Sequence, residues 1–390
     1  MPDAFYDDPF PTYHALRTAD PVHRCADGSI FLTRYDDVVA VYQDHARFVS
    51  DKRFEFAPKF GATPLYEHHT TSVVFRDPPD HTRIRRLFAP AFTPRALAAL
   101  EPRIERLVDG LLAEAAARGG MDVVDDFAAA VPVQLIGDML GIPADERGPL
   151  RGWSLAILGA LEPAPDPAQL DAGNRAVEAF KDYLRRLIAA RRRRPSTDPG
   201  EILSALLAAE NAGDRLTEVE LFHQCIFLLN AGHETTTNLI ANAVLTLLKH
   251  PDAAARLRAE PGLIATAVDE FLRYESPNQL GNRRAAAGAV IAGVSLPPDT
   301  LITLCIGAAN RDPAQFPDPD RVDLARRPNR HLAFITGIHA CAGMWLARME
   351  GRVAIARLVA RFPGLRLAGA PVRGRRARFR TLVSLPVAVG

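Results

Sequence analysis

The chain of 390 residues is 48% hydrophobic and 24% charged, which is ordinary globular usage and excludes a disordered or fibrous chain. Its 47 basic and 46 acidic side chains give a formal net charge of +1, so no whole-molecule field attracts nucleic acid or an anionic membrane. We therefore expect neither of these as a partner.

The start of the chain bears on where the protein works. The segment MPDAFYDDPF carries acids and prolines where a signal peptide has a basic start and an apolar core. The four cysteines are far apart in the sequence, and no apolar run approaches the roughly 18 residues of a membrane span. We expect a cytoplasmic monomer.

Helical patterns dominate the predicted elements. Two short β runs, 22–25 and 29–33, flank the turn residues Asp27-Gly28 and predict a hairpin. Apolar periodicity then predicts helices over residues 96–118, 127–140, 176–194, 217–249, 263–274 and 344–361. Short β runs return between residues 290 and 306, and residues 310–330 fit neither period. With no internal repeat or linker-like stretch, the pattern predicts one domain over residues 1–390, mainly α with a minor β part (α+β).

The segment Phe334 to Gly343, FITGIHACAG, places a cysteine directly before the last predicted helix. At a helix N-terminus the macrodipole and the free backbone N–H groups stabilise the thiolate of Cys341. Gly337 and Gly343 let the backbone fold closely around the sulfur, and His339 could project a donor toward the same object. The segment therefore predicts a site built around this sulfur.

Three interpretations compete for Cys341. It could be a buried core residue, as free cysteines often are. A nucleophile elbow needs glycine at position 339 and a histidine later in the chain, and neither is present. The third is a thiolate ligand of haem iron, which donates electron density that favours O–O cleavage. The residues alone leave the first and third interpretations open.

The longest predicted helix has an unusual middle, LLNAGHETTT. A zinc HExxH motif is excluded because Thr237 stands where the second histidine is needed. Ala231 and Gly232 remove large side chains from one face, and Thr235 can bond back to the carbonyl of Ala231 and open the helix. Glu234 could then pass protons into the resulting groove. The alternative is a helix crossing at a small residue, with Glu234 solvated.

Three smaller pairs carry weaker signals. Glu270 and Arg273 are three residues apart on a predicted helix, a spacing that is common among exposed ion pairs. His81 and Arg85 share a helix face and could bind an anion or lie on the surface. For His68-His69 we expect a solvated loop rather than a metal or substrate contact.

Together these segments resemble the soluble bacterial cytochromes P450, which are haem-thiolate monooxygenases. The resemblance covers nearly the whole chain, and its motifs occur in the family's order. They are the cysteine loop Phe334 to Gly343 with Leu346-Ala-Arg after it, the groove Ala231 to Thr236, the Glu-x-x-Arg of Glu270 to Arg273, and the meander Phe316 to Arg321.

The resemblance implies a triangular, haem-enclosing helical fold with a long central helix, and it implies roles for single residues. Cys341 would be the axial ligand of haem b (iron protoporphyrin IX), and Glu234 and Thr235 would deliver protons to bound dioxygen. Charge-assisted bonds to the haem propionates would come from His81, Arg85, Arg283 and His339. Further cofactor contacts would come from Ala231, Gly232, Phe334 and Gly343. Arg321 would complete the buried network of Glu270 and Arg273.

The implied reaction inserts one atom of dioxygen into a small organic substrate, by hydroxylation or O-dealkylation. Electrons would come from a ferredoxin and a ferredoxin reductase, with Arg83, Arg86 and Arg348 as candidate contacts or ordinary surface arginines. The aromatic-rich segment 54–75 lies where the family's pocket-covering loop sits, compatible with an apolar or aromatic substrate. Two alternatives stay open, a peroxide-driven peroxygenase and a non-catalytic haem-thiolate sensor or carrier. The acid–alcohol pair argues against the peroxygenase.

Two residues depart from the family pattern. Ile335 stands where a small residue, most often glycine, follows the loop phenylalanine. If this position requires a positive φ, a β-branched side chain is strained there. Val322 replaces the usual phenylalanine of the meander.

Overall fold

The computed structural model describes residues 3–88, 92–162, 164–198, 200–210 and 216–390. They form two compact units. The first unit comprises the chain up to residue 50 and residues 107–128 and 235–390, and the second comprises residues 51–106 and 129–234. The chain passes between the units four times, and two of these crossings fall inside helices, α8 (Glu101–Arg118) and α13 (Glu218–Lys249). Each unit is described by itself.

The first unit contains the main sheet. Its strands are, in spatial order, β1 (Val22–Arg24), β2 (Ile30–Leu32), β8 (Leu301–Cys305), β5 (Leu280–Ala285) and β3 (Phe48–Val49). Strands β2 and β8 are parallel, whereas the other neighbours are antiparallel. The predicted hairpin is therefore confirmed as β1–β2. Buried side chains of α3 (Tyr35–Gln43) join those of β2 and β8 in one core cluster.

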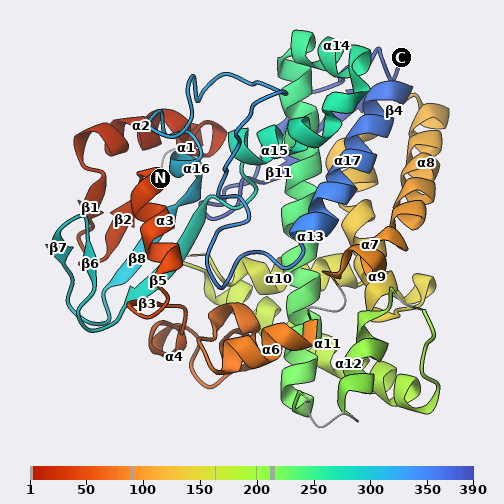
Figure 1. Cartoon of the computed structure of the whole chain (residues 1–390). Coiled ribbons are helices and arrows are strands. Elements are labelled where there is room, and N and C mark those ends of the chain that lie inside the picture. The colour runs from red at the N-terminus through yellow and green to blue at the C-terminus, as the bar shows by residue number, and fades with distance from the viewer. Residues whose placement is uncertain (1–2, 89–91, 163, 199, 211–215) are drawn as a thin grey trace. The chain divides into compact units, whose positions relative to one another are not determined.

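The first unit also contains short strands outside the main sheet and most of its helices. The short strands are β4 (Gly120–Asp122), β6 (Val290–Ile291), β7 (Val294–Ser295), β9 (Arg366–Leu367), β10 (Val372–Arg373), β11 (Leu382–Ser384) and β12 (Pro386–Ala388). The helices are α1 (Asp3–Asp7), α2 (Phe10–Ala19), α14 (Pro251–Ala259), α15 (Ile264–Tyr274), α16 (Ile306–Ala309) and α17 (Met344–Arg361). Helix α17 packs against α15 and α14 (Figure 1). The last helix and α15 match the predicted ranges closely.

The second unit is helical. Its helices are α4 (Arg53–Phe60), α5 (Pro64–Thr71), α6 (Asp80–Phe88), α7 (Pro94–Ala98), α9 (Ala130–Leu140), α10 (Leu150–Gly159), α11 (Pro167–Arg193) and α12 (Ile202–Glu210). Helix α11 packs against α10 and α5. The helix predicted over 96–118 is in fact two helices, α7 and α8. Helix α11 begins earlier than predicted because Asp166 and Gln169 form a capping box there.

Helix α13 is the long helix that the sequence predicts (Figure 1). Thr217 and Glu220 cap its start reciprocally: the Glu220 N–H donates to Thr217 Oγ1 at 3.2 Å, and the Thr217 N–H donates to Glu220 Oε2 at 2.9 Å. The mainly α, minor β class is confirmed. In the described parts of the chain, none of the helices combines the length and apolarity that a bilayer crossing needs.

The expectation for His68 and His69 is wrong. Both lie in α5 and each is only 2% exposed, so they are buried helical residues and not part of a solvated loop. The segment faces the interior because Gln224 of α13 bonds its backbone: Gln224 Oε1 accepts from the Val73 N–H at 3.0 Å, and its Nε2 donates to the Thr71 carbonyl at 2.8 Å.

Glu270 and Arg273 form a fully buried ion pair in the first unit. Both are 0% exposed, and two hydrogen bonds of 2.8 Å join the guanidinium to the carboxylate. The remaining donors of Arg273 reach three backbone carbonyls, those of Asn310, Pro319 and Arg321. Every N–H of this guanidinium thus has an acceptor, which is the condition under which a buried ion pair is tolerated.

The predicted role of Arg321 is wrong. Its side chain is exposed, and only its backbone carbonyl enters the network, accepting from Arg273 and Arg326. The second guanidinium beside Glu270 belongs to Arg326, whose Nε lies 3.1 Å from Glu270 Oε2. The meander between residues 311 and 330 has the irregular backbone that the sequence predicts, and its turns set which arginine points inward.

We predict that Glu270→Gln lowers the free energy of unfolding by about 3–5 kcal/mol, because it leaves the buried cations of Arg273 and Arg326 without a counter-charge. Denaturant unfolding of the purified protein at neutral pH measures this. Glu260→Gln is the matched control, since Glu260 pairs with Arg256 on the surface, and its loss should stay within about 1 kcal/mol. Equal losses in the two variants would contradict the prediction.

Candidate functional site

A tight loop in the first unit presents Cys341. The cysteine is half-buried and lies just before α17, whose N-cap residue is Gly343. The Cys341 N–H donates to the Phe334 carbonyl at 3.0 Å, and the Ala340 N–H donates to the Gly337 carbonyl at 3.0 Å. These bonds close the loop on itself at the start of a helix, as the sequence predicts, so the macrodipole of α17 acts at the sulfur.

The loop takes two residues with positive φ. Gly337 has φ +77°, and a Cβ there would collide with the backbone carbonyl of Tyr42 at the end of α3. Ile335 has φ +50°, so the strain expected for a β-branched residue at this position is present. Its N–H donates to the Leu332 carbonyl at 2.8 Å and its side chain packs against the sheet core, which holds the strained conformation in place.

The four residues expected at the propionates lie on different elements. In the first unit Arg283 is on β5, with its guanidinium 4.9 Å from the centre of the Tyr42 ring, and His339 is in the cysteine loop. Both are buried. In the second unit His81 and Arg85 lie one turn apart on α6, His81 buried and Arg85 half-buried. Each unit thus places one histidine and one arginine, donors suited to a carboxylate.

One face of α13 carries solvent-accessible residues, whereas the rest of the helix between residues 221 and 247 is buried. We call this face the open stripe. Between residues 221 and 247 every residue is buried except Phe227, Leu228, Ala231, Gly232 and Thr235. Their spacing of i, i+4 and i+8 puts them on one face. The small residues of the predicted groove thus lie on an accessible face of the helix, and Thr235 lies on it while Glu234 is buried.

Gly232 also serves helix packing. A Cβ at this position would lie 2.6 Å from Cδ1 of Ile136, which belongs to α9 in the same unit. The alternative of a helix crossing at a small residue therefore holds for Gly232. The second part of that alternative, a solvated Glu234, is wrong, because its side chain is buried.

Sequence reasoning missed a buried carboxyl, Glu350 of α17. It hydrogen-bonds the hydroxyl of Thr236 on α13, within the first unit, and burial raises its pKa to about 8. A signal was present: Leu346, Met349, Glu350 and Val353 have the spacing of one buried helix face, so the glutamate stands at a core position.

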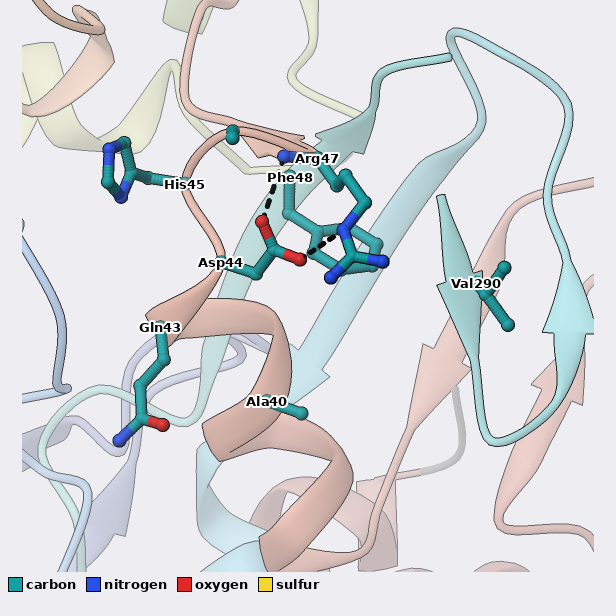
Figure 2. Close-up of a pocket in the computed structure, with 8 residues that line it drawn as sticks. Ala40, Gln43, Asp44, His45, Arg47, Phe48 and Val290 are labelled. Carbon is teal, nitrogen blue, oxygen red and sulfur yellow. Dashed lines mark hydrogen bonds and ion pairs between the residues drawn. The ribbon is translucent and has the colours of Figure 1, made fainter. Parts of the chain in front are cut away.

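A separate hollow of about 450 Å³ lies at the end of α3 (Figure 2). Asp44 and Arg47 pair at its wall, with Arg47 Nε 2.5 Å from Asp44 Oδ2, and Phe48 and Val290 also line it. None of the residues predicted from the sequence lines this hollow. It is therefore not the predicted site.

The metal-binding side chains of the described residues suit a metal ion that is already coordinated by an organic cofactor. Among the described residues no group of three or more His, Cys, Asp or Glu side chains could hold a bare metal ion. A porphyrin supplies four ring nitrogens and needs one protein ligand, and the half-buried thiol of Cys341 just before α17 is of the kind that can serve as one. The residues present therefore fit haem.

Comparison with known proteins decides the family. The family model for cytochrome P450 matches residues 161–365. The vitamin D(3) 25-hydroxylase of Pseudonocardia autotrophica is 41% identical over 93% of this chain and 89% of its own. Cytochrome P450 107B1 of Saccharopolyspora erythraea is 40% identical over 100% of this chain and 96% of its own. The chain belongs to the cytochrome P450 family.

A solved structure confirms the P450 fold. P450BioI, crystallised with an acyl carrier protein that carries a fatty acid, has a TM-score of 0.93 and 36% sequence identity, with 100% of each chain covered. The protein is thus a P450 monooxygenase of the bacterial type, and the family binds haem iron. The roles of its single residues and its single-domain organisation remain predictions.

Replacement of Ile335 tests the strain in the cysteine loop. Ile335→Ala and Ile335→Gly both lose the packing of the side chain, but only glycine adopts φ +50° without steric cost. We expect the glycine variant to be more stable than the alanine variant by about 1 kcal/mol, since alanine would pay the left-handed penalty. Thermal and denaturant unfolding measure the difference. At a position with ordinary φ alanine would be the more stable of the two, and that order would contradict the prediction.

The carboxyl of Glu350 predicts a pH dependence of stability. Because its folded pKa of about 8 lies above its ordinary value of 4.5, the group stabilises the fold fully below pH 4.5 and loses this contribution as the pH rises toward 8. The uncharged isostere Glu350→Gln should match the wild type near pH 5 and exceed it in stability at pH 8. Denaturant unfolding at a series of pH values checks this. A difference that does not change with pH would show that Glu350 is ionised throughout.

Proposed function

We propose that the protein is a haem b monooxygenase that inserts one atom of dioxygen into a C–H or O-alkyl group of a small organic substrate. A ferredoxin and its reductase would supply the electrons. The observation that carries the proposal is the closed loop that presents Cys341 at the start of α17, in a chain of the P450 family.

In this proposal the chain's own residues hold the cofactor. Haem bound through the Cys341 thiolate supplies the activation of dioxygen. The helix N-terminus of α17 and the loop N–H groups favour the thiolate form of the sulfur. His81, Arg85, Arg283 and His339 neutralise the two propionates, while Ala231, Gly232, Phe334 and Gly343 contact the porphyrin.

Glu234 and Thr235 handle protons in this proposal. The Thr235 hydroxyl lies on the open stripe of α13, where it could donate a hydrogen bond to dioxygen as a substrate and be reprotonated in turn. Glu234 is its neighbour on the buried side of the helix and holds the proton that replaces the one donated. Positioned proton donors of this kind contribute about 10²–10⁴-fold to a rate.

The open stripe supports an apolar substrate. Phe227 and Leu228 lie on it, both about two turns before Thr235, and offer hydrocarbon surface. The aromatic segment 54–75 is weaker support, because Phe56 packs on Phe60 and Phe75 at ring distances of 5.1 and 5.2 Å. Vitamin D3, named for the 41%-identical relative, is a suitable first probe of this hydrophobic class.

The arginines proposed as ferredoxin contacts differ in their environments. Arg83 pairs with Glu220, and Arg348 lies 2.7 Å from Asp269 and over the Phe334 ring, so both have structural roles. Arg86 is exposed and remains the better candidate for a partner's acidic surface. A cytoplasmic location and a monomeric state stay predictions.

Thr235→Ala tests the reaction. We expect the variant to keep the red-shifted ferrous carbonyl band that a thiolate ligand gives, but to lose most product and release hydrogen peroxide, because the proton donor is gone. The measurement is the amount of product and of hydrogen peroxide formed per NADPH consumed, with a surrogate ferredoxin and ferredoxin reductase supplying the electrons. Thr237→Ala, a buried threonine of the same helix away from the open stripe, is the control. Unchanged coupling in Thr235→Ala would remove Thr235 from the mechanism, and absence of the red-shifted band in the wild type would overturn thiolate ligation.

A further inference from the structure

Three imidazoles lie together in the interior of the second unit. His68 and His69 of α5 are each 2% exposed and His223 of α13 is 0% exposed. The His68 ring centre lies 4.9 Å from that of His69 and 5.5 Å from that of His223. Such polar groups are costly to bury, so their presence between two packed helices needs an explanation.

The cluster reaches the surface through Glu67. This residue is the one before His68 on α5, and its side chain is 41% exposed. Its Oε1 lies 3.5 Å from His223 Nε2, and its Oε2 accepts a hydrogen bond of 3.0 Å from Lys181 of α11. A solvated carboxylate is therefore held directly against a buried imidazole.

Asn230 continues the line on the inner side. Asn230 Nδ2 and His68 Nε2 are 3.3 Å apart, whereas Asn230 Oδ1 and His68 Nδ1 have no partner among the described residues. The amide can donate to a bare Nε2 or, turned over, accept from a protonated one, so it can serve both proton states of His68. His223, Asn230 and Glu234 share one face of α13, with spacings of seven and four residues.

These side chains lead from the solvated Glu67 inward to Asn230, and Glu234 lies one turn beyond Asn230 on the same face of α13. We propose that Glu67, His223 and His68 form a proton pathway to Glu234, with Asn230 as the positioning residue that orients His68. The proposal rests on the function proposed above. It accounts for a set of buried polar side chains that α5 and α13 contribute.

The step balances without any other reactant. Glu67 takes a proton from water and passes it to one ring nitrogen of His223, which releases the proton of its other nitrogen to His68. His68 does the same toward Glu234, so Glu234 gains one proton and bulk water loses one. Glu67, His223 and His68 end with the proton number they began with once the rings have reset their tautomers. Neutral imidazole suits this because one nitrogen accepts while the other donates.

The surroundings keep both imidazoles neutral at pH 7. Burial and the rings of His69 and His223 hold the pKa of His68 well below its ordinary value. Burial lowers the pKa of His223 to about 4, with Lys181 acting in the same direction and Glu67 and Glu178 opposing it. A proton therefore passes through the pair without being trapped there.

Hydrogen exchange gives a readout that does not depend on turnover. The measurement uses the diamagnetic ferrous carbonyl form of the protein with 15N-labelled histidine. We expect the His68 ring N–H to exchange its proton with water faster than an equally buried ring N–H that has no pathway to the surface. His223→Phe keeps the ring volume but cuts the path, so this exchange should slow by about tenfold or more. An unchanged exchange rate would overturn the proposal.

Coupling gives the functional readout. In the holoenzyme with a plant-type ferredoxin, its NADPH reductase and vitamin D3 as probe, His68→Phe and His223→Phe should each raise peroxide released per NADPH several-fold. This rise in peroxide release should be larger at higher pH. Without the pathway, protons must come directly from bulk water, which holds fewer free protons as the pH rises. His69→Phe is the matched control, since the His69 ring lies off this line among Phe56, Phe60 and Phe75, and it should leave coupling unchanged.

The variants separate this proposal from the function on which it rests. Loss of coupling in Thr235→Ala with normal coupling in His68→Phe and His223→Phe would refute the pathway and leave the monooxygenase intact. If a phenylalanine variant does not fold, Asn230→Leu replaces it. That variant should change the tautomer signal of His68 and raise peroxide release while the red-shifted carbonyl band persists, and an unaltered His68 signal would refute the role of Asn230.

Discussion

The buried ion pair of Glu270 and Arg273 is the contact on which the cysteine loop depends. Arg273 holds the carbonyl of Asn310, and the Asn310 side chain in turn accepts from the Leu332 N–H at 2.7 Å. The Leu332 carbonyl receives the N–H of Ile335, where the loop begins its strained turn. A guanidinium with five rigid donors can fix several backbone segments at once, which a hydrophobic contact cannot do. The ion pair therefore organises irregular backbone that no helix or sheet holds.

Strain in the loop is tolerated because its surroundings fix it. Ile335 keeps a left-handed backbone while its side chain packs on the sheet core, and Gly337 lies against the carbonyl of Tyr42. Relaxing either residue would break the hydrogen bond from Cys341 to Phe334 or displace α3. A sulfur presented in this way has little freedom to move, which is what a metal ligand requires.

Sequence reasoning succeeded where a signal is periodic or local, and failed where orientation depends on irregular backbone. The helices α13, α15 and α17 were predicted because their apolar spacing is regular, and the strain at Ile335 because one backbone angle decides it. Arg321 was assigned from the family resemblance where the structure has Arg326, and the turns of the meander have no period from which an inward direction could be read. His68 and His69 were misjudged because the side chains that hold their segment, Gln224 on its backbone and Asn230 on His68, are some 150 to 160 residues away in sequence.

Helix geometry explains how one segment of α13 can serve two environments. Successive residues of an α-helix are separated by about 100° around the axis, so Glu234 and Thr235 cannot share a face. Thr235 falls in the open stripe with Ala231, while Glu234 falls with Asn230 on the buried polar side. An acid and an alcohol at adjacent positions therefore face the buried polar side chains and the open stripe, respectively, within a single turn. A spacing of three or four residues would instead put both groups on one face of the helix.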